Sequence, residues 1–245
     1  MGLLITFILG IFVLAGAAIA GFAKDEQRIR ELSVAVALGA ILVLLAFDLI
    51  PEALEGAEEI GWPITMLAIV IGFLALVVLD RFLPESPATH HESHANSTAL
   101  HISIATTIAL SIHNIIEGMS VYGVATESLG TAFMLAFGIG IHNLPMGMIV
   151  YTGVRGQSLA KRVIVLGAAA LSTFIGGLIM FALGEAVDEH VVAIMIAVTI
   201  GLLLYIVLAE LLPHVLKTSN RPRAIAGVLI GAIVVFVGIS LAGLA

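Results

Sequence analysis

The sequence predicts an all-α integral membrane protein: a bundle of eight transmembrane helices in one domain, residues 1–245. Hydrophobic residues make up 60% of the chain and charged residues 11%, whereas soluble domains average about 45–50% and about 25%. The mean hydropathy is +1.18. The apolar residues fall into eight runs, each near the roughly 20 residues that a helix needs to cross a bilayer core. We therefore expect this chain to lie in the lipid bilayer, and we expect no nucleic acid as a partner.

The eight expected spans are separated by glycine, proline and charged residues. They cover about residues 2–22, 33–50, 63–83, 99–123, 130–153, 160–183, 191–214 and 224–244. The first run starts at residue 2 without a basic leader or a small-residue cleavage site, which predicts a retained helix and not a signal peptide. The chain has no cysteine, so disulfides and thiolate metal sites are excluded.

The charges are segregated between alternate loops. All ten basic residues lie in or beside the first, third, fifth and seventh loops: Lys24, Arg28, Arg30, Arg81, Arg155, Lys161, Arg162, Lys217, Arg221 and Arg223. The other loops carry only acids: Glu52, Glu55, Glu58, Glu59, Glu127, Glu185, Asp188 and Glu189. The positive-inside rule places the basic loops in the cytoplasm and both termini outside. We expect a multi-pass protein of the cell membrane, either plasma or inner membrane.

Two neighbouring spans contain near-copies of one polar motif. IHNIIEGM at 112–119 returns as IHNLPMGM at 141–148, and five of the eight positions match at a spacing of 29. In the first copy His113 and Glu117 are four residues apart, so they share a helix face. Measured from the turn near residue 126, His113 and His142 lie at depths of about 20 and 24 Å, at 1.5 Å per residue. An antiparallel helix pair can therefore bring the two copies together near mid-membrane.

The residues of these motifs favour a metal site. A carboxylate at the centre of a membrane helix costs about 2.5–3.5 kcal/mol on translocon scales, and a bound cation at Glu117 would offset this. Imidazole and carboxylate groups suit first-row metals such as zinc and iron. Asn114 and Asn143 could add carbonyl oxygens and Met146 a thioether. A lone intramembrane histidine is more often hydrogen-bonded within the bundle, and a lone Met is more often packing, but two histidines at matched depth favour a site.

These residues resemble the ZIP (Zrt/Irt-like) family of divalent metal transporters. HNIIEG is similar to the HNxPEG motif of that family, and HNLPMG to its second signature. FDLIPEA in span two and LYIVLAELLPH in span seven resemble its paired polar segments. The resemblance implies a 3+2+3 arrangement, in which an inverted repeat relates spans one to three to spans six to eight. It also makes a homodimer a candidate assembly.

The resemblance further implies a function and a ligand set. Family members move Zn²⁺, Fe²⁺, Mn²⁺, Co²⁺ or Cd²⁺ into the cytoplasm as substrates, and no separate cofactor is expected. The implied metal ligands are His113, Asn114 and Glu117 in span four, and His142 and Asn143 in span five. Asp48 in span two and Glu210 in span seven take the places of polar residues near the pathway.

Three positions depart from the family pattern. Ile116 replaces a proline, Met146 stands where a second glutamate is usual, and Met180 stands where many members have a further glutamate. Members with both glutamates can hold two metals, so we expect a mononuclear site here, weaker for Mn²⁺ and more tolerant of Cd²⁺. Pro145 leaves the carbonyl of Ile141 without its helical donor and predicts a bend in span five.

Other polar residues admit two interpretations each. His90, His91 and His94 lie on a cytoplasmic loop predicted at about 84–98, which is either a metal-receiving patch or a solvated linker.

Pairs of ionisable residues at i,i+4 spacing occur near the ends of spans two and seven. Asp48 and Glu52 form an i,i+4 carboxylate pair at the outer end of span two, and this pair could be an entrance station. Glu210 and His214 repeat this spacing and either serve an exit path or cap a helix end.

Two other classes of function remain open from the sequence. An intramembrane metal-dependent hydrolase would need an open metal position and a general base, but both motif histidines are followed by Asn and the H-E-x-x-H pattern is absent. The missing glutamates also allow a non-transporting sensor or degenerate scaffold. The chain has no nucleotide-binding motif, which argues against an ATP-driven pump. A non-enzymatic transporter is the main expectation.

Overall fold

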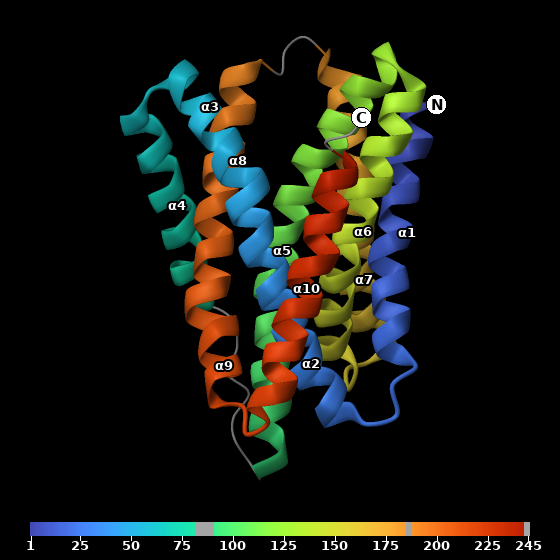
Figure 1. Cartoon of the computed structure of the whole chain (residues 1–245), viewed down its shortest axis with the longest axis vertical. Helices are drawn as coiled ribbons and strands as arrows, with labels where there is room; N and C mark the ends of the chain where they lie inside the picture. The colour runs from blue at the N-terminus through green and yellow to red at the C-terminus, as the bar shows by residue number, and fades with distance from the viewer. Residues whose placement is uncertain (82–90, 185–187, 243–245) are drawn as a thin grey trace.

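The computed structural model describes residues 1–81, 91–184 and 188–242, which are helical apart from short connections and contain no strand. Within this part of the chain, eight helical segments are long and apolar enough to cross a membrane. The predicted all-α, eight-span architecture is therefore confirmed (Figure 1).

The spans follow the order of the sequence, and two of them contain a π-helical turn. In chain order they are α1 (Gly2–Gly21); α2 (Glu26–Leu44), η1 (Leu45–Leu49) and α3 (Ile50–Ile60); α4 (Trp62–Asp80); α5 (His91–Glu127); α6 (Leu129–Val154); α7 (Leu159–Leu183); α8 (Glu189–Tyr205), η3 (Ile206–Leu211) and α9 (Leu212–Lys217); and α10 (Arg221–Ala242). Side-chain oxygens of Asp25, Ser128, Ser158 and Asp188 cap the first turns of α2, α6, α7 and α8. Such caps satisfy backbone N–H groups that a helix start leaves unpaired.

Two stretches that the sequence predicted as loops are helical. The acidic segment after span two forms α3, so that only Gly61, with φ of +86°, separates it from α4. Pro51 directly follows the π-helical turn, where the backbone hydrogen-bonding pattern is shifted, and such a turn can accommodate a residue that has no N–H to donate. The predicted histidine loop is also shorter, because α5 already begins at His91.

The histidine segment is thus only partly described. His91 and His94 belong to the first turn of α5, where no Gly or Pro interrupts the chain, and not to a loop. His90 and the rest of the predicted loop up to it lie outside the described residues.

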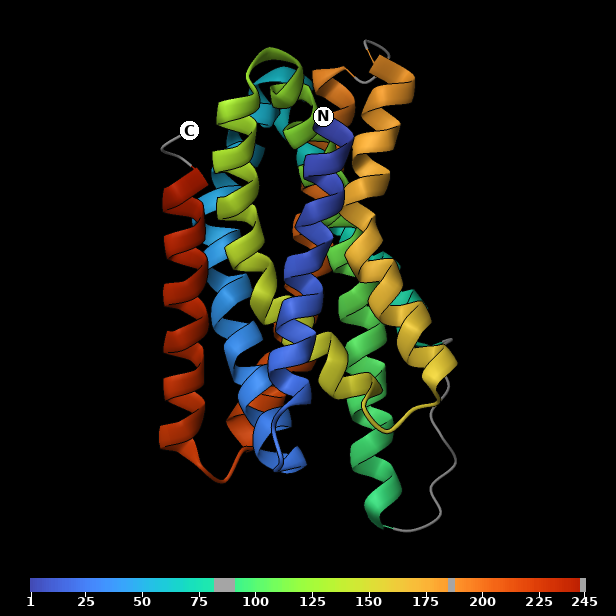
Figure 2. The ribbon, with the colours of Figure 1, turned by 90° about the vertical axis from the view of Figure 1, so that its right-hand side faces the viewer.

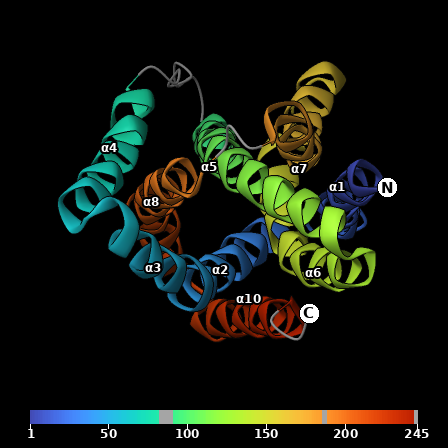
Figure 3. The ribbon, with the colours of Figure 1, turned by 90° about the horizontal axis from the view of Figure 1, so that it is seen from above.

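The helices form two bundles. The first contains α1, α5, α6 and α7, and the second contains α2 with α3, α4, α8 with α9, and α10. Figure 3 shows the bundles side by side, with the first on the right of the view. The main contacts between them run from α6 to α10 and α2, and from α5 to α8. The metal-binding candidates on α5 and α6 therefore belong to one bundle and face the other.

Reciprocal glycines mark the closest helix crossings within each bundle. A Cβ atom at any of these eight glycines would lie 1.9–2.1 Å from a backbone oxygen of the facing helix: Gly16 with Gly147, Gly118 with Gly176, Gly39 with Gly231, and Gly72 with Gly201. Small residues allow such close helix packing in membranes. The crossings α1–α6 and α2–α10 correspond to α7–α5 and α8–α4, as the inverted repeat in a 3+2+3 arrangement requires.

The two ends of the molecule differ in charge. Both termini lie at the end where α3, α5 and α7 finish (Figures 1 and 2), and Glu55, Glu58 and Glu59 lie there too. The basic residues of the predicted cytoplasmic loops are placed at the opposite end by the helix order. Trp62, the one tryptophan of the chain, begins α4 at the acidic end with 55% of its surface exposed. This position suits an aromatic side chain at a membrane interface.

Candidate metal centre

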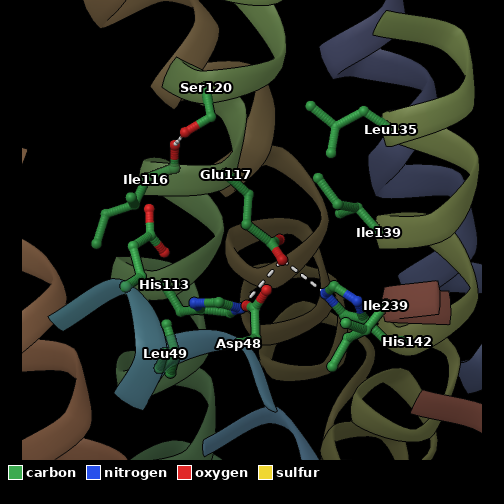
Figure 4. Close-up of a pocket in the computed structure, with 11 residues that line it drawn as sticks. Asp48, Leu49, His113, Ile116, Glu117, Ser120, Leu135, Ile139, His142 and Ile239 are labelled. Carbon is green, nitrogen blue, oxygen red and sulfur yellow. Dashed lines mark hydrogen bonds and ion pairs between the residues drawn. The ribbon is translucent and has the colours of Figure 1, made fainter. Parts of the chain in front are cut away.

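The centre is built from one turn of α5 and one turn of α6. Glu117 and His113 project from the same face of α5, and His142 faces them from α6 (Figure 4). The Oε1 atom of Glu117 lies 2.6 Å from Nε2 of His142 and 3.0 Å from Nε2 of His113. The three side chains are buried, with exposed fractions of 2%, 8% and 3% for His113, Glu117 and His142. The expectation that the antiparallel helix pair brings the two motifs together is confirmed.

The arrangement of donor atoms is one that could hold a metal ion. One ligand atom from each of these three residues lies within 4.8 Å of the others. Glu117 has a second carboxylate oxygen with no hydrogen-bond partner among the described residues, and Nδ1 of each histidine is unpartnered too. Buried polar atoms normally have partners, so this cluster has spare capacity for a ligand.

A cavity of about 150 Å³ adjoins the cluster. It is lined by Asp48, Leu49, Glu52, His113, Ile116, Glu117, Ser120, Leu135, Ile139, His142 and Ile239. Since liquid water occupies about 30 Å³ per molecule, the cavity has room for a cation with several waters. Ser120 and Leu135 lie above the cluster in Figure 4, toward the acidic end of the molecule.

The π-helical turn η1 brings the second bundle to the cavity. Asp48 lies within this turn, and its carboxyl group approaches His113 in Figure 4. Glu52, one helical turn further on, also lines the cavity. Single π-helical turns often occur at functional sites. The pair that the sequence singled out as an entrance station thus lies beside the candidate ligands.

Three predicted ligands lie outside this cavity. Asn114, Asn143 and Met146 are buried but are not among the lining residues. Asn114 donates from Nδ2 to the carbonyl of Ala169 on α7 at 3.4 Å, while neither amide atom of Asn143 has a partner among the described residues. Met146 packs within the main hydrophobic core. The structure therefore divides the predicted ligand set into a cavity-lining group and a neighbouring group.

The remaining candidates lie away from the centre. Met180 is near the end of α7 and does not line the cavity. Glu210 lies in η3, the counterpart of η1 in the inverted repeat, and His214 lies in α9. His91 precedes His113 by 22 residues on one helix, which corresponds to about 33 Å at 1.5 Å per residue.

Sequence reasoning missed the contribution of α10. Ile239 lines the cavity, and a Cβ atom at the neighbouring Gly238 would lie 3.2 Å from the backbone nitrogen of His142. Neither residue carries a polar group, so no pattern in the sequence distinguished this turn of α10 from a lipid-facing helix. Leu135 and Ile139 on α6 also line the cavity and are also apolar, so no pattern in the sequence indicated their position.

Comparison with known proteins agrees with this geometry. The sequence model of the ZIP zinc transporter family matches residues 84–239, well over half of the chain and including both polar motifs. The chain belongs to the ZIP family. The resemblance found in the motifs of α5 and α6 is thereby confirmed.

Several named relatives of this ZIP chain are similar over almost its full length. The zinc transporter ZupT of Enterobacter sp. (strain 638) is 28% identical over 240 residues, covering 94% of this chain and 92% of the relative. ZupT of Corynebacterium aurimucosum is 28% identical over 242 residues, with 93% and 91% covered. ZupT of Escherichia coli O7:K1 is 27% identical over 215 residues, with 85% and 83% covered.

Proposed function

We propose that this ZIP chain is a secondary transporter that carries divalent transition-metal ions, zinc foremost, into the cytoplasm. The observation that carries this proposal is the buried cluster of His113, Glu117 and His142 in a chain whose relatives are named zinc transporters. Two imidazole nitrogens and a carboxylate are ligands that zinc accepts readily. Fe²⁺, Co²⁺ and Cd²⁺ share enough of this chemistry to be further substrates.

The geometry of the cluster suits capture of a cation. Both Nε2 atoms face the same oxygen of Glu117, so an ion placed among them would meet three donor atoms that already converge. Asp48 lines the same cavity and would supply a fourth donor from the second bundle. Ligands bind metal in their deprotonated form, so the ion would take the place of protons held within the cluster.

The charge distribution supports the proposed orientation of the chain in the membrane. We assign the basic end to the cytoplasm and both termini to the outside, because positive residues favour the cytoplasmic side. The cavity extends from the cluster toward the acidic end, where Glu52 would attract cations. On the opposite side, Glu210 in η3 is the repeat-related counterpart of Asp48 and our candidate for the exit path. The cell membrane, plasma or inner, is the proposed location.

The site is proposed to hold one ion. Among the residues that line the cavity, Glu117 is the one carboxylate from α5 or α6. The side chain of Met146 packs in the core and does not line the cavity. Calorimetric titration of the purified protein with Zn²⁺ should therefore give one tight site per chain, and titration with Mn²⁺ a weaker one. Two tight zinc sites lost together on substituting His142 would contradict this.

Uptake into proteoliposomes tests the function as a whole. The intact protein should accumulate zinc, and His142→Ala should reduce the rate by at least about 10-fold, because one of three converging ligands is lost. Absence of uptake by the intact protein, with metal binding retained, would favour a sensor or scaffold. A hydrolase is not favoured by the naming of the relatives as transporters. Crosslinking in the membrane would test the proposed homodimer.

A further inference from the structure

Helix α10 contacts the metal centre from behind, at the backbone of one candidate ligand. Gly238 lies so close to α6 that a Cβ atom there would sit 2.7 Å from the carbonyl oxygen of Gly138, 3.2 Å from the nitrogen of His142 and 3.3 Å from its Cβ. The first of these distances is shorter than real contacts allow, and the atom concerned belongs to a helix backbone. The absence of a side chain at residue 238 is therefore what permits this approach.

The contacted turn of α6 has less internal support than an ordinary helical turn. Pro145 lies inside α6 and has no N–H to donate to the carbonyl of Ile141. Figure 2 shows that α6 changes direction about halfway along its length. Helix bends at proline have this cause. The position of His142 thus depends on what packs against its turn as well as on the helix itself.

His142 is held from two sides. Its Nε2 atom is 2.6 Å from Oε1 of Glu117, and α10 packs closely against its backbone at Gly238. His113 differs, because it shares a helix with Glu117. Ile239, next to Gly238, forms part of the cavity wall. One turn of α10, in the second bundle, therefore packs against the backbone of His142 and also forms part of the wall of the adjoining cavity.

We propose that Gly238 is a positioning residue of the metal centre: its bare backbone seats α10 against α6 and holds His142 at the distance from Glu117 that metal binding requires. The proposal rests on the proposed function, since it assumes that the His113–Glu117–His142 cluster binds the transported ion. A methyl group at residue 238 would push the His142 turn away from α10 and alter the geometry of that one ligand.

The test is Co²⁺ binding to purified, monodisperse Gly238→Ala protein. We expect about a 10-fold rise in Kd, the lower end of the effect of losing groups that orient metal ligands, together with a changed ligand-field spectrum. The matched control is Gly227→Ala on the same helix, where a Cβ atom would meet Ala35 at 2.8 Å, far from the centre. This control should lower the unfolding temperature without changing the spectrum or the Kd.

Combining Gly238→Ala with His142→Ala distinguishes a positioning effect on His142 from a general loss of structure. In a His142→Ala background, Gly238→Ala should have no further effect on Co²⁺ affinity, because non-additivity is expected of residues that act through one another. Additive effects, or an unchanged spectrum in folded Gly238→Ala protein, would overturn the proposal. Failure of the proposed function is distinct, since the intact protein and His142→Ala would then bind Co²⁺ alike.

A second variant covers the case in which Gly238→Ala does not fold. The chain has no cysteine, so Ile239→Cys introduces a single thiol at the cavity wall. Zn²⁺ should slow its modification by a water-soluble thiol reagent, whereas Thr126→Cys at the exposed α5–α6 turn should react at the same rate with and without Zn²⁺. Equal reactivity of Ile239→Cys in both conditions, in protein that calorimetry shows to bind Zn²⁺, would mean that α10 does not adjoin the occupied centre and would overturn the proposal.

Discussion

Glu117→Gln is expected to reduce zinc uptake by about 100-fold or more. Losing a group that merely orients a metal ligand costs about 10–100-fold, and Glu117 supplies the charged oxygen on which both histidines converge. Glutamine keeps the size of the side chain, and its amide can still hydrogen-bond to the neighbouring histidines. The variant should therefore fold normally, and initial rates of zinc uptake in proteoliposomes measure the loss.

The control for this prediction lines the same cavity. Ser120 lies three residues further along α5, and its hydroxyl donates to the carbonyl of Ile116 in its own helix at 3.1 Å. Ser120→Ala should therefore transport zinc at close to the rate of the unaltered protein. Near-normal uptake by Glu117→Gln would mean that the carboxylate is not a ligand and that the ion takes another route.

Gly147→Ala is expected to lower the midpoint of thermal unfolding by roughly 6–12 °C. The added Cβ atom would lie 1.9 Å from the carbonyl oxygen of Val13 and 3.0 Å from the nitrogen of Ala17. Backbone atoms cannot rotate away, so α1 and α6 must separate. Overpacking costs about 1–3 kcal/mol, and we take the upper end, about 3 kcal/mol, because the clash is with backbone. In a chain of this size each kcal/mol shifts the midpoint by about 2–4 °C.

The matched control, Gly167→Ala, is expected not to lower the midpoint of thermal unfolding. A Cβ atom added at Gly167 on α7 would meet nothing within 4 Å, and alanine favours a helix by about 1 kcal/mol over glycine. Gly167→Ala should leave the midpoint unchanged or raise it. Equal losses at residues 147 and 167, measured in one detergent, would show that the close crossing of α1 and α6 contributes nothing to stability.

Much of this architecture could be predicted because the membrane restricts the choices. Hydrocarbon offers no partner for backbone groups, so apolar runs of sufficient length must be helices. The meeting of His113, Glu117 and His142 followed from helix rise and from the position of one turn. The family resemblance predicted which spans are related by the inverted repeat, and the close helix crossings at glycines follow the same pairing.

The rest could not be predicted because it depends on local helix geometry. A π-helical turn shifts the register of Asp48, and hydropathy gives no sign of it. Met146 stands four residues after His142, as Glu117 does after His113, yet it packs in the core. Spacing within a helix does not determine its rotation against its neighbours, and a flexible thioether fills apolar space readily. The role of α10 was invisible because Gly238 and Ile239 are apolar.

The position of Trp62 makes its fluorescence an intrinsic reporter of one end of the molecule. Because the chain has a single indole, all of its tryptophan emission originates at the start of α4, where the side chain is half exposed at the acidic end. An aqueous quencher confined to one compartment can therefore report which way the molecule is inserted. Variants at the buried histidines and at α10 leave this emitter untouched, so the same preparation serves for orientation and for metal binding.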